Sequence, residues 1–270
     1  QWSDLINWVL YIVIWYQPGI DRQEWVEWIF RDGAVHGVLW IFVFVYVLIP
    51  LVQLGFYRGL HFIPYVHRYK IQTRLPTVKE QTLIQSQFIE FVGNAILLVT
   101  IVYGFISWAG PVTMETWRRS QVEQVPTRWT TFYQSVISVV VADAVFYTGH
   151  RISHSTRLYR YHKQHHEFQM PVPLSVRNVH WMDALLALFM MWIPLALFPS
   201  MHIFTFVFIT ILGLVHGFYD HSGWDLPVPV FQFVPFANHV RAHDDHHRLN
   251  CGNYGGYFTC WDDWGGTRIV

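Results

Sequence analysis

The sequence has few charged residues and no excess of either sign. Charged residues make up 13% of the 270 residues, and 18 lysines and arginines balance 18 acidic residues. Proteins that bind nucleic acids normally carry basic clusters that neutralise phosphates, so we expect no nucleic-acid partner. The low charge, together with 53% hydrophobic and 18% aromatic residues, indicates an integral membrane protein rather than a soluble domain.

The sequence also lacks the motifs of several enzyme classes. It contains no H-E-x-x-H, G-x-S-x-G, G-x-G-x-x-G or Walker loop, so metalloprotease, esterase, dinucleotide and nucleoside-triphosphatase chemistry are without their signatures. The attachment motif of covalent haem, C-x-x-C-H, is absent as well. The two cysteines, Cys251 and Cys260, do not have the C-x2-C spacing of zinc sites, and we expect them to be free thiols.

Long apolar runs predict membrane-spanning helices. Residues 37–56 form a stretch of twenty without a charge, and about twenty helical residues cross a hydrocarbon core of about 30 Å. Residues 88–108 form a second predicted span, and residues 131–149, which contain Asp143, form a third. Fourteen tryptophans, several of them near the N-terminus, are typical of interfacial belts, and they favour an N-terminal segment that lies on the membrane surface.

Two shorter apolar runs, 184–198 and 203–215, are separated by Pro199 and Ser200. At about 1.5 Å per residue neither run spans comfortably alone. They predict either a helical hairpin extended by flanking residues or a partly re-entrant pair, with a buried soluble hairpin as the alternative. The fold class that we expect is an all-α integral membrane protein with four or five hydrophobic helices.

Histidine is concentrated in the second half of the chain. Thirteen of the 16 histidines lie between His150 and His247. Eight of them fall in three tight groups, His150-x3-His154, His162-x2-His165-His166 and His243-x2-His246-His247. Residues three or four apart lie on one face of a helix, so the rings of each group can point at a common centre. Eight histidines exceed the four ligands of a structural zinc site, and the number therefore indicates two metal ions.

The predicted topology places all three histidine groups on one side of the membrane. If the third span ends near His150 and the hairpin returns near His216, the loop 57–81 emerges on the same side. That loop carries five basic residues: Arg58, Arg68, Lys70, Arg74 and Lys79. The positive-inside rule then predicts that the histidine side faces the cytosol, as a dimetal cap on the helices.

The type of ligand does not identify the metal, because neutral imidazole binds Fe, Cu, Ni and Zn. A two-metal site beside apolar helices favours oxygen chemistry on a lipid, which suits iron and excludes zinc because zinc has no redox chemistry. Since the chain has no nucleotide-binding or flavin motif, electrons must come from another protein. A zinc-dependent membrane hydrolase is the alternative from another class. A non-catalytic haem protein is the third possibility. It is less favoured because bis-histidine haem needs paired histidines within the spans, whereas the histidine groups of this chain lie at the span ends and beyond.

Four motifs resemble those of the sterol desaturase and fatty acid hydroxylase superfamily. They are H-R-I-S-H (150–154), Y-R-Y-H-K-Q-H-H-E-F (159–168), D-H-S-G-W-D-L-P (220–227) and H-D-D-H-H (243–247). Within the superfamily, Tyr69-Lys-Ile-Gln72 and the H-K-x-H-H-E-F block are similar to C4-methylsterol oxidases. The segment N-Y-G-G-Y-F-T-C-W-D-D-W-G-G-T (253–267) is closer to sterol C5-desaturases, and Ala242 stands where C4-methylsterol oxidases tend to have a histidine.

The resemblance implies a multi-pass enzyme of the endoplasmic reticulum with a centre of two iron ions. It implies O2 as co-substrate, electrons from NAD(P)H through cytochrome b5 and its reductase, and a lipid substrate, most plausibly a sterol. Carried over position by position, it implies ten metal ligands, five for each ion: His150, His154, His162, His165, His166, His180, His221, His243, His246 and His247. His180 has the alternative of an interfacial histidine, and His216 is then the candidate to replace it.

Carboxylates close to the histidines are candidates for orienting them, because a metal-bound histidine usually donates its second ring N–H to a carboxylate or carbonyl. The candidates are Asp183, Asp220, Asp244, Asp245 and Asp262. Asp143 lies inside a predicted span on the same helical face as His150 and His154, and a carboxylate in that position is costly unless it has a partner. We expect Asp143 to assist catalysis through the ligands, with a helix-packing hydrogen bond as the alternative.

The sequence thus predicts one membrane-embedded fatty acid hydroxylase-like domain over residues 1–270, with its histidine-rich catalytic part at about 131–270. Oxidation of a C4-methylsterol is the leading activity. Sterol C5-desaturation and hydroxylation of a fatty acyl or sphingoid chain are alternatives, because desaturation and hydroxylation share the hydrogen abstraction.

Overall fold

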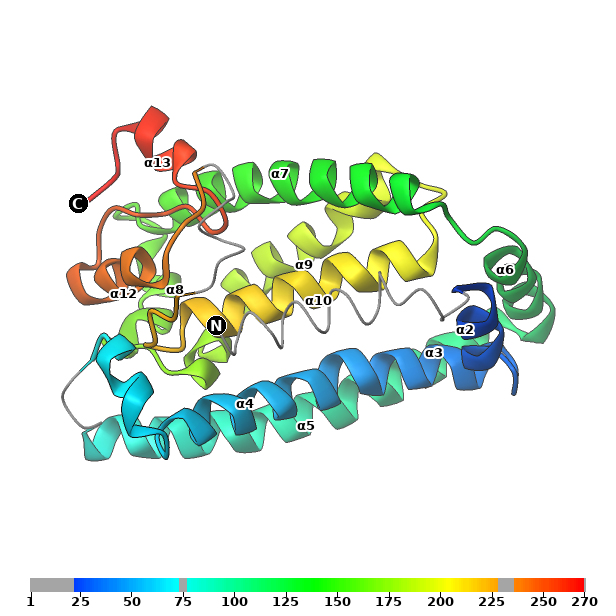
Figure 1. The fold of residues 1–270 in the computed structure, drawn as a ribbon, viewed down its shortest axis with the longest axis horizontal. Helices are drawn as coiled ribbons and strands as arrows, with labels where there is room; N and C mark the ends of the chain where they lie inside the picture. Colours follow the sequence, from blue (N-terminus) through cyan, green and yellow to red (C-terminus); the bar gives the residue numbers. More distant parts are fainter. Residues whose placement is uncertain (1–21, 73–76, 228–235, 270) are drawn as a thin grey trace.

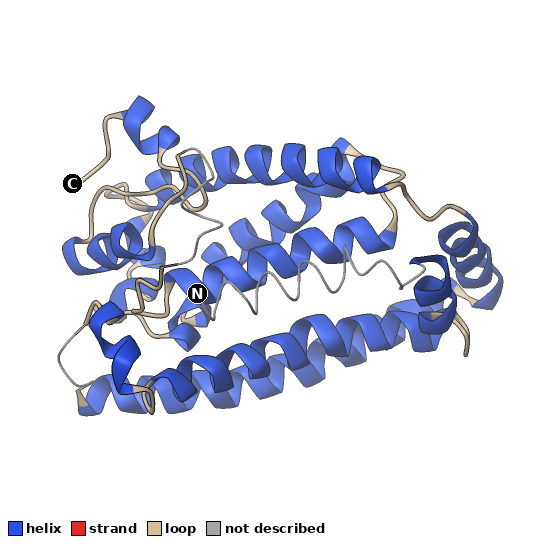
Figure 2. Ribbon diagram, viewed as in Figure 1, coloured by secondary structure: helices blue, strands red, loops and turns tan. Residues whose placement is uncertain are grey.

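A computed structural model describes residues 22–72, 77–227 and 236–269, and Figures 1 and 2 show that these residues are predominantly helical. The longer helices in chain order are α2 (Arg22–Ile29), α3 (Ala34–Val43), α4 (Ile49–Leu60), α5 (Val78–Ala109), α6 (Pro111–Glu123), α7 (Arg128–Ser153), α9 (Trp181–Leu197), α10 (Ile203–Asp220) and α12 (Val240–Leu249). The short helical segments are η1 (Phe44–Leu48), η2 (Pro64–Tyr69), α8 (Tyr159–His162), η3 (His165–Glu167), η4 (Pro173–Arg177) and α13 (Cys260–Gly265). No strand occurs in the described residues, so the all-α expectation is confirmed for them.

Four helices are long and apolar enough to cross a membrane. They cover Ala34–Leu60, Val78–Ala109, Arg128–Ser153 and Ile203–Asp220. The first of these joins α3, η1 and α4 in one continuous helix, and each of the three predicted long spans extends beyond its apolar run. Together with the shorter apolar helix α9, they give the expected set of four or five hydrophobic helices.

The surface of α5 supports a membrane location. This helix of 32 residues is about 48 Å long, and only 6% of its most apolar window is buried against the rest of the chain. Large apolar side chains such as Ile89, Phe105 and Trp108 point outward. A surface of this kind is expected in contact with lipid, because exposed apolar area of this extent is rare on soluble proteins.

The two short apolar runs form a helical hairpin, as one of the two expectations had it. Flanking residues extend the runs to 17 residues in α9 and 18 in α10, and both helices run along the bundle beside α7 (Figure 1). The close approach of α7 and α9 depends on Gly149, because a Cβ atom there would lie 2.7 Å from Leu186. This contact brings the C-terminal end of α7, with His150, against the start of α9.

The elements that carry the histidine groups lie at one end of the bundle. Figure 1 shows α8, α12 and α13 at that end, whereas α2 and α6 lie at the other. A small apolar core that includes Tyr57, Phe218 and Trp224 packs beneath α12 through Val240. The expected gathering of the histidine motifs at one end is therefore present. The N-terminal tryptophans Trp2, Trp8 and Trp15 and the basic residue Arg74 lie outside the described residues.

Candidate metal centre

Nine histidines are brought together in two adjacent groups. The first group contains His150, His154, His162, His166 and His246. The second group contains His165, His221, His243 and His247. Within each group, one ring nitrogen of every member lies within 4.8 Å of the others, and all members except His154 are buried. Nine of the ten predicted ligands therefore converge.

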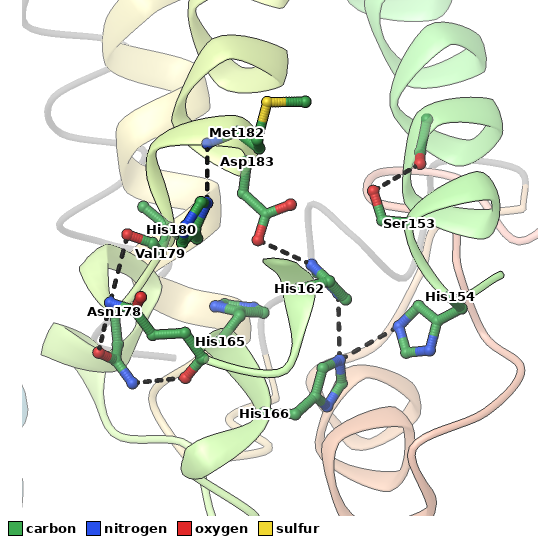
Figure 3. Close-up of polar contacts among 12 residues, drawn as sticks. Ser153, His154, His162, His165, His166, Asn178, Val179, His180, Met182 and Asp183 are labelled. Carbon is green, nitrogen blue, oxygen red and sulfur yellow. Dashed lines mark hydrogen bonds and ion pairs between the residues drawn. The ribbon is translucent and has the colours of Figure 1, made fainter. Parts of the chain in front are cut away.

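Four separate parts of the chain supply these rings. His150 lies in the last turn of α7, and His154 caps that helix. The segment from α8 to η3 provides three histidines, α12 provides three more at helical spacing, and His221 caps the C-terminal end of α10. The two groups meet at His166 and His247, whose ring centroids lie 4.7 Å apart. Figure 3 shows the rings of His162 and His154 directed at His166 within the first group.

The Nε2 atoms point at common centres. The Nε2 atom of His166 lies 3.2 Å from the Nε2 atoms of both His154 and His162. In the second group, the Nε2 atom of His221 lies 3.3 Å from that of His165 and 3.1 Å from that of His243. Imidazole ligands about 2.1 Å from one ion, at angles of about 90–110°, have nitrogens roughly 3.0–3.4 Å apart. The observed spacing is therefore that of rings around a metal.

At five of the nine rings the opposite nitrogen, Nδ1, has a fixed hydrogen-bond acceptor. The Nδ1–H groups of His150, His246 and His247 donate to the carbonyl oxygens of Tyr254, Gly252 and Phe168, at 2.9, 2.6 and 2.9 Å. His221 donates in the same way to Gly217, at 2.8 Å, and His162 donates to the carboxylate of Asp183, at 3.0 Å. A proton on Nδ1 leaves the lone pair of Nε2 free for a metal.

Burial disfavours the charged form of several histidines of the two groups. It is the largest cause that lowers the pKa of His166 to about 2, and of His154 and His221 to about 4 each. Burial and, after it, neighbouring imidazoles also hold the pKa well below its usual range at His165, His243, His246 and His247. Neutral imidazole is the form that binds metal, so the electrostatics suit two metal ions.

The donor set fits iron and other metals that accept imidazole. The Nε2 atoms of His150, His246 and His247 are buried and have no hydrogen-bond partner in the described part of the chain. A buried polar atom without a partner is costly, and a metal ion at the centre of each group would satisfy these atoms, His150 and His246 in the first group and His247 in the second. Nitrogen donors alone do not distinguish Fe from Zn or Cu.

His180 lies outside both groups. Its Nδ1 atom accepts a hydrogen bond of 3.3 Å from the backbone N–H of Met182, at the start of α9 (Figure 3). Its ring lies against that of Tyr161, with 5.0 Å between centroids. A neutral ring that accepts at Nδ1 carries its proton on Nε2, which leaves no free lone pair for a metal. The assignment of His180 as a ligand thus stays a prediction, and the geometry favours a helix cap instead.

His216 is also separate from the groups. Its Nε2 atom lies 3.0 Å from a carboxylate oxygen of Asp220, and its ring stacks on Tyr257 with 4.0 Å between centroids. The structure therefore supplies five histidines to the first group and four to the second, and neither His180 nor His216 completes the second.

Asp143 holds the C-terminal segment rather than a histidine. Its carboxylate accepts hydrogen bonds from the backbone N–H groups of Tyr257 and Phe258, at 2.7 and 2.9 Å. A third bond of 2.8 Å comes from the indole N–H of Trp261. These contacts match the alternative of a packing hydrogen bond, except that the partner is the C-terminal segment rather than another spanning helix. Through this segment Asp143 acts on the site indirectly, because Tyr254 provides the acceptor for His150.

Among the other candidate carboxylates, Asp183 alone of the five accepts from a histidine of the two groups, and that histidine is His162. Asp262 accepts from the backbone N–H groups of Tyr254 and Gly255 and so fixes the loop beside His150. Asp244 accepts from the side-chain amide of Gln72, and Asp245 forms an ion pair with Arg248.

Two features of the site are not apparent from the sequence motifs. The main acceptors for the rings are backbone carbonyls, which have no residue signature. Gln72, from the Tyr69–Gln72 motif, ties the first loop to α12 by donating to Asp244 and to the carbonyl of Pro171. The segment is further fixed by backbone bonds from Ile71 to Gly223 and from Asp225 to Tyr69.

Comparisons with known proteins agree with this geometry. Residues 135–267, which include both histidine groups, match the model of the family described as fatty acid hydroxylase. The chain is 29% identical to methylsterol monooxygenase 1 of Rattus norvegicus over 216 residues, which cover 77% of this chain and 69% of the relative. It is 32% identical to methylsterol monooxygenase 1 of Gallus gallus over 213 residues, which cover 76% and 68%.

A relative with another name matches a shorter region. The chain is 36% identical to lathosterol oxidase of Rattus norvegicus over 147 residues, which cover 53% of this chain and 47% of the relative. No solved structure matches the chain.

Proposed function

Because this chain belongs to the fatty acid hydroxylase family, within the sterol desaturase and fatty acid hydroxylase superfamily, and is an oxidoreductase, we propose that it oxidises a sterol with O2 at a centre of two iron ions. The leading reaction is C–H oxidation of a C4-methylsterol, as in a methylsterol monooxygenase. One observation supports this most strongly, namely two adjacent groups of histidines, all but one of them buried, at the end of apolar helices.

The protein's own residues hold and orient the site. The nine Nε2 atoms would hold the ions, and the backbone carbonyls beyond them fix the rings in the tautomer that binds metal. Bound iron would supply the redox chemistry with O2 that removes a hydrogen atom from an unactivated carbon. Burial of the rings keeps water away from the centre, and Phe146, whose ring centroid lies 5.1 Å from that of His150, contributes an apolar wall.

The activity can be tested in cells that lack their own C4-methylsterol oxidation. Expression of this chain should lower the accumulated 4-methylsterols, and a matched His165→Ala variant should not. Unchanged 4-methylsterols with a well-expressed protein would contradict the leading reaction. In the purified protein, iron with O2-dependent turnover is the expected result. Zinc alone with O2-independent turnover would indicate the hydrolase, and a Soret band would indicate haem.

Sterol C5-desaturation is the second candidate. The relative named lathosterol oxidase is 36% identical over its 147 matched residues, and its name motivates a sterol oxidation other than that of a methyl group. In a strain that lacks C5-desaturation, rescue by this chain would move the proposal to this reaction. Accumulated non-hydroxylated sphingoids after loss of the gene would instead indicate the acyl or sphingoid hydroxylase.

The histidine end of the bundle faces the cytosol in this proposal, and the membrane is that of the endoplasmic reticulum. The basic residues Arg58, Arg68 and Lys70 lie at the histidine end, as the positive-inside rule requires. Cys251 is exposed beside α12 and offers a direct test. In sealed microsomes, a membrane-impermeant maleimide should label the Cys260→Ser variant at Cys251. Labelling only after permeabilisation would reverse the orientation.

Electrons from NAD(P)H reach the site through cytochrome b5 and its reductase in this proposal, because the chain carries no nucleotide-binding motif. Reconstitution in vesicles tests the route. Turnover should need both proteins, and full turnover without cytochrome b5 would identify another donor.

A further inference from the structure

Arg177 lies next to the site and forms no ion pair with any residue that the structure describes. It is the last residue of η4, and burial lowers the pKa of its guanidinium. Its Nε atom is buried and has no hydrogen-bond partner among the described residues. The guanidinium lies over the ring of Phe91, 4.9 Å from the centroid, and near the phenol of Tyr46. Arg177 as a whole is half-buried, and a buried donor atom that makes no hydrogen bond is costly, so this one calls for an explanation.

A second polar atom without a partner lies close by. Gln87 is buried on α5, one helical turn before Phe91, so both side chains lie on one face of the helix. Its Oε1 atom is buried and has no hydrogen-bond partner in the described part of the structure. An orphaned donor thus lies over the ring of Phe91, and an orphaned acceptor lies one helical turn from Phe91.

The orientation of the Gln87 amide follows from a chain of hydrogen bonds. The backbone carbonyl of Gln164 can only accept, and the Nδ2 atom of Asn178 donates to it at 2.6 Å. The Oδ1 atom of Asn178 then accepts from the Nε2 atom of Gln87, at 3.0 Å. Oε1 of Gln87 is therefore the atom without a partner, and it needs a donor.

The same hydrogen bonds connect this place to the metal centre. Gln164 precedes the ligand His165, and Asn178 follows Arg177 directly. Figure 3 shows Asn178 beside the loop that carries His165. The two orphaned groups therefore lie where α5 and the first span meet the ligand loop, at the histidine end of the bundle. A lipid that reaches the metals from the bilayer would present its polar end near this level.

We propose that Arg177 and Gln87 bind the hydroxyl group of the sterol substrate, with Arg177 donating to its oxygen and Gln87 accepting its proton. A hydroxyl group satisfies both orphaned groups, because it accepts and donates at once, whereas a carboxylate or phosphate would satisfy only the arginine. Held in this way, the polar end fixes how far the ring system reaches toward the metals. The assignment rests on the proposed sterol substrate and adds the two residues that recognise it.

The test compares a 4,4-dimethylsterol with its 3-deoxy analogue in wild type and in Arg177→Met. Both sterols are titrated under argon into the purified, metal-loaded protein, so that binding is measured without turnover. Wild type should prefer the hydroxysterol, and Arg177→Met should reduce that preference about tenfold or more, as expected for loss of a hydrogen bond to a charged group. In the kinetic assay, the loss should fall mainly on KM. An unchanged ratio of the two affinities would overturn the proposal.

Matched controls separate recognition from folding. Arg68 is an exposed arginine that also lies over an aromatic ring, that of Tyr65, at 4.0 Å, and Arg68→Met should keep the ratio. Gln87→Met should lower the ratio, whereas Gln53→Met should not, although Gln53 is also a glutamine of a spanning helix and its buried Oε1 has no partner among the described residues. If added anionic phospholipid abolishes the preference of wild type for the hydroxysterol, the ligand is a membrane phosphate and the proposal fails.

The binding assay also keeps this inference distinct from the proposed activity. Binding of the hydroxysterol without turnover in air would contradict the proposed reaction and leave the site intact. Turnover together with an equal affinity ratio of the two sterols in wild type and Arg177→Met would support the proposed reaction and contradict the proposed hydroxyl site.

Discussion

The carboxylate of Asp143, within a spanning helix, accepts a hydrogen bond of 2.8 Å from the indole N–H of Trp261, near the C-terminus. This contact joins α7 to the segment that orients His150, and the first prediction concerns it. In Asp143→Asn, the new amide NH2 group faces N–H donors of the C-terminal segment and cannot accept from them. The substitution should lower the free energy of unfolding by about 2–4 kcal/mol, because hydrogen bonds to charged groups contribute about 1.5–3 kcal/mol each. Thermal unfolding in detergent should fall together with metal content.

The matched control for Asp143 is Asp263→Asn. Asp263 lies in the same segment but forms a surface ion pair with Arg268, at 3.0 Å, and such pairs contribute about 0–1 kcal/mol. Loss of activity in Asp143→Asn at unchanged stability and metal content would show a direct catalytic role instead.

The second prediction is the metal count. His165→Ala removes one ring of the second group and leaves the first group complete, so bound iron should fall from two ions toward one per chain and activity should fall at least about a hundredfold. Metal analysis of the purified variant gives the count. His36→Ala, at an exposed histidine of α3, should retain both ions. Two ions in active His165→Ala would exclude His165 from the ligands.

The third prediction separates the two roles of His180. Asparagine is a good residue at the start of a helix, so His180→Asn should preserve the cap of α9 and leave metal content and activity within about twofold. If His180 is a ligand, His180→Asn will instead lose metal as His165→Ala does. Metal analysis and turnover of the two variants side by side decide the matter.

The fourth prediction concerns acid. The folded protein holds the pKa of several ligand histidines far below the usual 6.5, for example about 4 at His221 and about 2 at His166. As pH falls below about 6.5, the unfolded chain takes up protons that the folded site refuses, so stability is highest above this pH and falls as the solution becomes more acidic. Unfolding temperature and bound metal should both decrease from pH 7 to 5. A flat profile across this range would show that the rings are solvated.

Most of the fold follows from the sequence because its signals are local. Apolar runs long enough to span a membrane predict the helices directly, and helical spacing of His243, His246 and His247 places these three rings on one face of α12. The bounds of the spans were less predictable, because the helices continue past their apolar runs. At the start of α5, for example, Thr77 and Glu80 form a capping box, and the helix begins ten residues before the predicted span.

The site was less predictable where it depends on tertiary contacts. The division into five and four histidines separates neighbours in sequence, because His165 and His166 point to different centres. The contacts of Asp143 were not predictable for the same reason. It shares a helical face with His150, but its partners lie more than a hundred residues away in the chain. The orphaned amide of Gln87 has no sequence signature at all.

The carbonyl acceptors behind the ligand rings have a consequence for how the centre tolerates change. At His150, His221, His246 and His247 the acceptor belongs to the main chain, so replacement of Tyr254, Phe168 or a neighbouring side chain leaves the acceptor in place as long as the loop keeps its course. At His162 the acceptor is a side chain, that of Asp183, and a single substitution removes it. The residues around four of these rings can therefore change without loss of the acceptor. The tautomer of the fifth ring, that of His162, depends on the one side chain of Asp183.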